Sequence, residues 1–194
     1  MLMVFAFVQV LAVAAAAVTL ADPQSPIAPV RIEPPGGGGN GVLVNVTGQE
    51  QDPVPLAGKW NASESCLGEV ACFASSWIEA NSTGSLEHVL ALRATAERPD
   101  VERRFRDPQL MTRNASRFNA VRKWGLLGWA EYGAFRIVFL TRDDEQSQSS
   151  IYTLPLRREG ARWAQTDALA TDSGVYEMFE RIGKAILERH RKRQ

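Results

Sequence analysis

The sequence predicts an α+β fold, and three observations support this class. Apolar residues recur at helical spacing from Val70 to Ile78. Segments rich in β-branched and aromatic residues follow between 126 and 169, and short polar turns separate them. A second helical pattern runs from Val175 to Ile186. Helices, an antiparallel meander and a terminal helix in this order are typical of an α+β domain.

Capping residues and prolines predict where the helices begin. The helix over 70–80 ends at the polar sequence 81–84, and Ser85 is positioned to cap a second, short helix. Pro99 and Pro108 occupy first-turn positions of two further helices. The last helix is expected to begin at Asp172 or Ser173.

Four strands are predicted, over 126–132, 134–142, 149–158 and 161–169. Phe135, Ile137 and Phe139 alternate with a second set of residues, as in a strand that has one face more buried than the other. Either set is a candidate to face the helices. Pro155 has no N–H for a ladder, so it indicates a sheet edge or a bulge.

The first 21 residues are uncharged and almost continuously apolar, and small residues precede position 22. This pattern predicts a signal peptide over 1–21 and a periplasmic or secreted protein. The alternative is an uncleaved membrane anchor, because about 20 apolar residues can span a bilayer. Membrane contact is expected only in that case. Arg outnumbers Lys strongly, which favours a bacterial envelope origin.

Residues 22–55 hold seven of the ten prolines and the glycine run 36–39. They are predicted to form a flexible linker, in which 42–46 has the composition of a short edge strand. The remaining residues, 56–194, are predicted to form a single α+β domain.

The two cysteines, Cys66 and Cys72, favour a disulfide in an exported chain. On one continuous helix they would lie about 9 Å apart along the axis, beyond the roughly 7 Å at which bridging is possible. The disulfide therefore requires Cys66 to lie in a turn before the helix, which Gly68 permits. Two unpaired thiols are the alternative.

Two stretches of the sequence resemble the nuclear transport factor two-like superfamily. One is Trp77-Ile78-Glu79-Ala80-Asn81 with Gly84-Ser85-Leu86-Glu87 after it, and the other comprises 151–156 and 160–163. The resemblance covers about 66–170. It implies a cone, in which N-terminal helices pack on a curved antiparallel sheet, and the C-terminal helix is an addition to it. The family includes enzymes and binding modules, so it does not select a function.

Charge and histidine content exclude several functions. The chain has 22 basic and 22 acidic residues, whereas nucleic-acid binding requires a basic surface, so no nucleic-acid partner is expected. His88 and His190 are the only histidines and lack metal-ligand spacing, so neither a metal site nor a cofactor is expected. His190 is interpreted as part of a solvated basic helix end, with contact to an anionic lipid or acidic partner as the alternative.

Four aromatic residues are candidates for a pocket or a partner-binding surface: Trp129, Tyr132, Tyr152 and Trp163. No residue is assigned a catalytic role, since no nucleophile–base pattern occurs. We expect an exported, non-enzymatic binding or protein-interaction domain of the cell envelope, whose partner is an envelope protein or a small apolar ligand. The alternative is a small cone-fold enzyme of the isomerase or dehydratase type that uses a pocket Tyr or Asp as acid or base.

Overall fold

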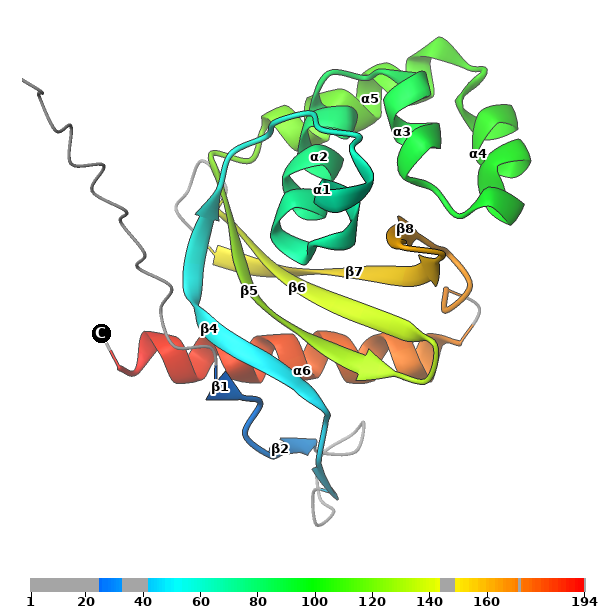
Figure 1. Cartoon of the computed structure of the whole chain (residues 1–194). Coiled ribbons are helices and arrows are strands. Elements are labelled where there is room, and N and C mark those ends of the chain that lie inside the picture. The colour runs from blue at the N-terminus through cyan, green and yellow to red at the C-terminus, as the bar shows by residue number, and fades with distance from the viewer. Residues whose placement is uncertain (1–24, 33–41, 144–148, 171, 194) are drawn as a thin grey trace, which may run out of the picture.

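The computed structural model describes residues 25–32, 42–143, 149–170 and 172–193, and the structural statements below refer to these residues. They form three layers (Figure 1): helices α1–α5 cover one face of a six-stranded sheet, and α6 crosses the other face. The predicted α+β class is confirmed. The expected signal peptide, 1–21, and the glycine run lie outside the described residues.

All neighbouring strands of the main sheet are antiparallel. In spatial order the strands are β1 (Ser25–Pro26), β4 (Gly48–Leu56), β5 (Lys123–Tyr132), β6 (Phe135–Asp143), β7 (Ser149–Glu159) and β8 (Arg162–Gln165). A separate two-stranded sheet pairs β2 (Val30–Ile32) with β3 (Val42–Val44). The predicted antiparallel meander is thus β5–β8, with β8 shorter than expected.

Three of the predicted helix starts are confirmed by hydrogen bonds that the capping side chains accept from backbone N–H groups. Ser85 accepts from the N–H of residue 88, Asp107 from that of residue 109, and Asp172 from that of residue 175. The helices are α1 (Glu64–Gly68), α2 (Val70–Ser82), α3 (Leu86–Leu92), α4 (Arg98–Phe105), α5 (Pro108–Asn119) and α6 (Ser173–Arg191), with a 3-10 turn, η1 (Thr95–Glu97).

The described part of the predicted linker, 22–55, is not a linker in the structure. Strand β4 pairs with β5 over 48–50 and again over 54–56, so it begins well before position 56, where the domain was expected to start. Upstream of it, Ile27 and Val30 are buried against α6. The prolines that suggested a linker, Pro53 and Pro55, lie beyond the β1 pairing on an edge strand, where a missing N–H is tolerated.

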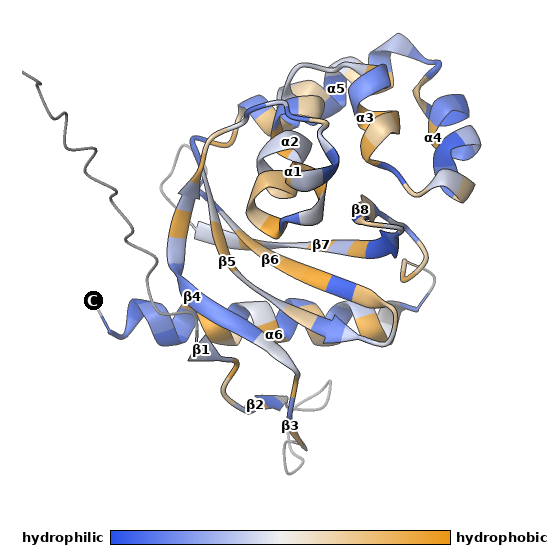
Figure 2. Ribbon diagram, in the orientation of Figure 1, coloured by the Kyte–Doolittle hydropathy of each residue, from blue (hydrophilic) through white to orange (hydrophobic). Residues whose placement is uncertain are grey.

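The core is divided by the sheet into two clusters. Val138 and Leu140 of β6 pack with the helices α1–α5, whereas Ile137 and Phe139 pack with α6. Each of the two alternating sets in this strand therefore faces helices, on opposite sides of the sheet. Figure 2 shows the resulting hydrophobic band along β6. Successive side chains of a β-strand point to opposite faces of the sheet. Because helices cover both faces here, both sets are buried.

The pairing of β5 is irregular with both of its neighbours. Its register against β6 shifts between Leu126 and Gly128, and the register of β4 against β5 shifts between Glu50 and Val54. Gly128 has φ +148°, and a Cβ there would lie 2.2 Å from the carbonyl oxygen of Gln49. Only glycine permits this approach. Such bulges bend a strand and redirect its side chains.

Candidate functional site

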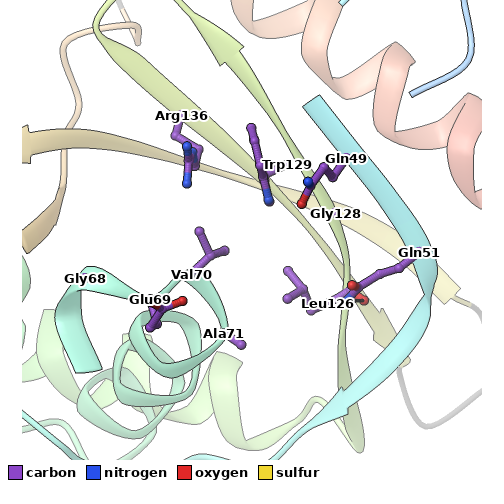
Figure 3. A pocket seen from close by; sticks show the side chains of 10 residues that line it. All are labelled: Gln49, Gln51, Gly68, Glu69, Val70, Ala71, Leu126, Gly128, Trp129 and Arg136. Carbon is purple, nitrogen blue, oxygen red and sulfur yellow. Dashed lines mark hydrogen bonds between the residues drawn. The ribbon is translucent and has the colours of Figure 1, made fainter. Parts of the chain in front are cut away.

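A cavity of about 240 Å³ lies between the start of α2 and the strands β4–β6 (Figure 3). The α1–α2 junction forms one wall, and the irregular part of the sheet forms the other. The lining residues are Gln49, Gln51, Gly68, Glu69, Val70, Ala71, Leu126, Gly128, Trp129 and Arg136. The bulges in β4 and β5 therefore shape this cavity.

The disulfide holds the helical wall of the cavity. Cys66 and Cys72 are bonded, with their Cα atoms 5.2 Å apart. The break that permits this bond lies at Glu69, whose extended backbone (φ −101°, ψ 129°) separates α1 from α2. Cys66 lies in the short helix α1 rather than in a turn, and the geometric requirement for bridging is met. Four of the five residues between the cysteines, 68–71, line the cavity, so the covalent loop limits the movement of this wall.

Arg136 lies between two indole rings. Its guanidinium carbon is 3.8 Å from the ring centre of Trp129 and 4.5 Å from that of Trp163. Glu131, its cross-strand neighbour, accepts a hydrogen bond from it at 2.8 Å. The Arg136 side chain is only 20% exposed. Cation–π contacts strengthen as they lose water, so the strand pair presents a fixed, partly neutralised guanidinium to the cavity.

Two polar atoms in this stack have no hydrogen-bond partner within the described part of the chain. They are Nε of Arg136 and Nε1 of Trp163. An unpaired buried donor costs about 1–3 kcal/mol, and such atoms in a folded protein call for an explanation. Gln49 and Gln51 add amide groups to the same cavity. The wall formed by the sheet thus combines an aromatic face with several hydrogen-bond donors.

The four predicted aromatic residues do not form one site. Trp129 lines the cavity. Trp163 does not, but its ring contacts Arg136, which does. Tyr152 belongs to a separate aromatic cluster in the core. Tyr132 is 40% exposed and contacts Phe179 of α6, with ring centres 5.5 Å apart. Tyr132 therefore lies on the opposite face of the sheet from the cavity, because it is three positions from Trp129 in a regularly paired part of β5 and side chains of a strand alternate between faces.

Tyr152 packs among aromatic rings of α2, α5 and β5. Its ring centre is 5.0 Å from that of Trp77 and 6.1 Å from that of Trp124. Phe118 completes the cluster. Burial raises the pKa of Tyr152 to about 12, so its phenol keeps the proton at neutral pH. Trp77 in turn donates a hydrogen bond to the buried side chain of Gln165 at 2.9 Å.

The interpretation of His190 as part of a solvated helix end is wrong. It is 3% exposed, and its Nδ1 lies 2.6 Å from the carboxylate of Asp52. The adjacent Arg189 is paired with the buried carboxylate of Glu50. Together these two pairs attach the end of α6 to β4. His190 and Asp52 border a second cavity, of about 320 Å³. The partners are 138 positions apart, so no local pattern could reveal the pair.

Arg136 was also absent from the predicted site, although one signal pointed to it. It occupies the same alternating set as Val138 and Leu140, both fully buried, so its side chain belongs to a covered face. An arginine at such a position needs a partner or a functional reason. The sequence carried no comparable signal for Gln49, Gln51 and Glu69. They line the cavity only because β4 is bulged and because the helix is broken at Glu69.

No family model, curated protein or solved structure matches this chain. In the described ranges, no helix has both the length and the apolar character needed to cross a membrane. No group of three or more His, Cys, Asp or Glu in those ranges could hold a metal ion. The disulfide indicates an oxidising compartment outside the cytoplasm.

Proposed function

We propose that the protein is an exported, non-enzymatic binding domain of the cell envelope that receives a segment of a partner protein in the cavity beside Trp129. The observation that carries this proposal is the Trp129–Arg136–Trp163 stack, in which an arginine with an unpartnered Nε borders an open cavity. Trp and Arg are the residues most often found at the energetic centres of protein interfaces.

The size and lining of the cavity favour a protein segment over a small apolar ligand. At about 240 Å³ it is smaller than most small-molecule pockets, which begin near 300 Å³. Glutamine amides, a carboxylate and a guanidinium share its wall with apolar side chains. A peptide segment offers both an apolar side chain and backbone carbonyls that accept hydrogen bonds from the wall.

The enzyme alternative has less support from the candidate acid–base groups. A general acid or base works best when its pKa lies near the operating pH, whereas burial raises the pKa of Tyr152 to about 12. Asp167 accepts a hydrogen bond from Arg93 at 2.7 Å, so its carboxylate is already engaged. Neither residue lines the cavity.

We further propose that the domain has the cone-shaped architecture of the nuclear transport factor two-like superfamily. The support is the arrangement of α1–α5 on one face of an antiparallel sheet, with a shared core of α2 and β5–β8 side chains. Helix α6 on the opposite face is the departure from that architecture. A periplasmic or secreted location is part of the proposal and is consistent with the disulfide.

Site-specific photo-crosslinking in a bacterial envelope tests the binding proposal. A benzoylphenylalanine replaces Ala71, an exposed residue of the cavity wall, or Glu177, an exposed residue of α6 that serves as the matched control. We expect a discrete protein adduct from position 71 only. The adduct should disappear when Arg136→Gln is added, while circular dichroism confirms that the domain is folded.

Three results would contradict the proposal. They are the absence of any adduct from position 71, the same adduct from position 177, and an adduct that persists in Arg136→Gln. A small apolar molecule that copurifies with the wild type and is lost from Trp129→Ala would support the ligand alternative. A measurable turnover lost from Tyr152→Phe would support the enzyme alternative.

A further inference from the structure

A second concave surface lies between α4 and α5, away from the residues that line the cavity beside Trp129. It encloses about 190 Å³ and is lined by Arg104, Phe105, Leu110, Arg113, Asn114 and Arg117. We call it the arginine groove. Three of its six residues are arginines, and none is acidic. The whole chain has a formal net charge of zero, so this positive charge is a local concentration.

The groove follows from the helical period. Leu110, Arg113, Asn114 and Arg117 occur at positions i, i+3, i+4 and i+7 of α5, which places them in one stripe. The last turn of α4 supplies Arg104 and Phe105 opposite that stripe. Phe105 and Leu110 are half-buried and form the apolar floor. The arginines, which are exposed, stand around it.

Contacts elsewhere hold both walls in place. Helix α5 is anchored to α2 by hydrogen bonds from Asn114 to Asn81 and from Asn119 to the carbonyl of Ser82. Helix α4 is anchored by Val101, which is 1% exposed. The groove is therefore formed before any partner arrives, which reduces the entropy lost on binding.

The acidic residues nearby do not neutralise the groove. Asp100 pairs with Arg103, Glu102 pairs with Arg106, and Asp107 caps α5. Arg104 has one distant carboxylate partner, Asp167 at 3.9 Å. Within the described ranges Arg113 and Arg117 have no ion-pair partner.

Arg113 and Arg117 are also an i, i+4 pair of like charge, an arrangement that destabilises an isolated helix. A partner that supplies carboxylates would remove this repulsion.

We infer that the arginine groove binds an acidic segment of a partner protein, with one large apolar side chain of that segment on the Phe105–Leu110 floor. Arginine clusters recognise acidic motifs through charge-assisted, bidentate hydrogen bonds. The volume of about 190 Å³ suits one side chain rather than a complete organic ligand. An anionic membrane fits less well. Binding in the membrane interface requires apolar side chains that project, and those of the groove are recessed.

Fluorescence anisotropy with the full chain tests the inference. The probe is a labelled synthetic peptide that has Glu on both sides of a central Leu. Two further peptides replace the Glu residues with Gln, or the Leu with Ala. We expect saturable binding of the first peptide that weakens as salt is raised, and affinity about tenfold lower for each of the other two.

A charge-matched pair of variants locates the binding surface. Arg113→Gln/Arg117→Gln removes two charges from the groove. Arg103→Gln/Arg106→Gln removes two exposed charges outside it, at the end of α4 and directly after it. We expect the groove variant to bind the peptide about tenfold more weakly. The control should change affinity by less than about twofold, the usual size of a screened surface contribution.

Several outcomes would overturn the inference: no binding to the wild type, an equal loss in both variants, or equal affinity for the Gln peptide. Tighter, Arg113- and Arg117-dependent binding to vesicles with anionic lipid than to the peptide would assign the groove to a membrane instead. The position-71 crosslink should persist in the groove variant, so failure of this inference is distinguishable from failure of the proposed function.

Discussion

The two faces of the sheet are built from similar strand residues but end in different states. The α6 face has an apolar core around Phe179, Ile182 and Ile186, and charge pairs at the C-terminal end of the helix. The opposite face carries an aromatic core beneath α2 and leaves a cavity where α1 gives way to α2. The α6 face also has a cavity, but it lies at the C-terminal end of the helix, beside His190. On the α2 face the cavity lies at the break between two short helices, beside Trp129.

The two faces also differ in how closely the helices pack against the sheet. A Cβ at Gly183 of α6 would lie 2.8 Å from Ile151 and 3.0 Å from Phe139, so helix and sheet are in direct contact there. On the α2 face, Trp129 is only half-buried, and its ring is covered by Arg136 rather than by a helix. The α6 face therefore contributes mainly to stability, and the α2 face supplies the candidate binding site beside Trp129.

The largest expected effect is on the α6 face. Phe179→Ala removes a side chain that is 2% exposed and should lower the free energy of unfolding by about 3–5 kcal/mol. Urea denaturation followed by circular dichroism measures it. A loss below about 1 kcal/mol would show that this face is not the stabilising one.

High pH should destabilise the aromatic core on the α2 face. The pKa of Tyr152 is raised from 10.0 to about 12 in the folded state. Between these values the unfolded chain releases the proton first, so stability falls as pH rises and is fully present below pH 10. The loss should be of order 2 kcal/mol across that window. Urea denaturation at pH 9–12 should show a steeper fall for the wild type than for Tyr152→Phe, and identical slopes would contradict the assignment.

Loss of the disulfide should affect the cavity wall more than the rest of the fold. Cys66→Ala/Cys72→Ala opens a short loop, so we expect a decrease of about 2 kcal/mol in the free energy of unfolding. Hydrogen exchange should accelerate over 64–72 and remain unchanged in α6. Equal acceleration on both faces would remove the distinction between them.

The smallest expected effect concerns the stack itself. Arg136→Lys keeps the charge but loses the planar contact with the two indoles, which should cost about 0.5–1 kcal/mol. Arg157→Lys, at an exposed position of β7, is the matched control and should be neutral. Thermal unfolding of both variants checks the difference. A larger loss from the control would indicate that stacking does not stabilise this part of the sheet.

Local features of the sequence predicted the elements well. Ser85, Asp107 and Asp172 cap helices within three positions of themselves, so their roles can be inferred from neighbouring residues. Pro155 indicated an edge or a bulge, and it lies one residue beyond the last β7–β8 pair. In each case the feature depends on residues close together in the chain, or on where the pairing of a single strand ends.

Features that depend on distant partners were missed or misread. Strand β4 was assigned to the linker, because its prolines and glycines are typical of loops. Its pairing depends on Gly48 and Gly128, which are 80 positions apart and allow two backbones to approach. Tyr132 is a different kind of error. It is three positions from Trp129, so the alternation of β5 alone places the two side chains on opposite faces.

By itself, the sequence determined the α+β class, the antiparallel meander and the helix starts, and it favoured the disulfide, since each rests on spacing or on capping between near neighbours. Tertiary structure alone decided that His190 is buried beside Asp52, and that Arg136 lies between Trp129 and Trp163 at a cavity. The physical reason is that solvation and charge pairing depend on which side chains the whole fold brings together. Hydrophobic periodicity describes only which face of its own element a side chain occupies.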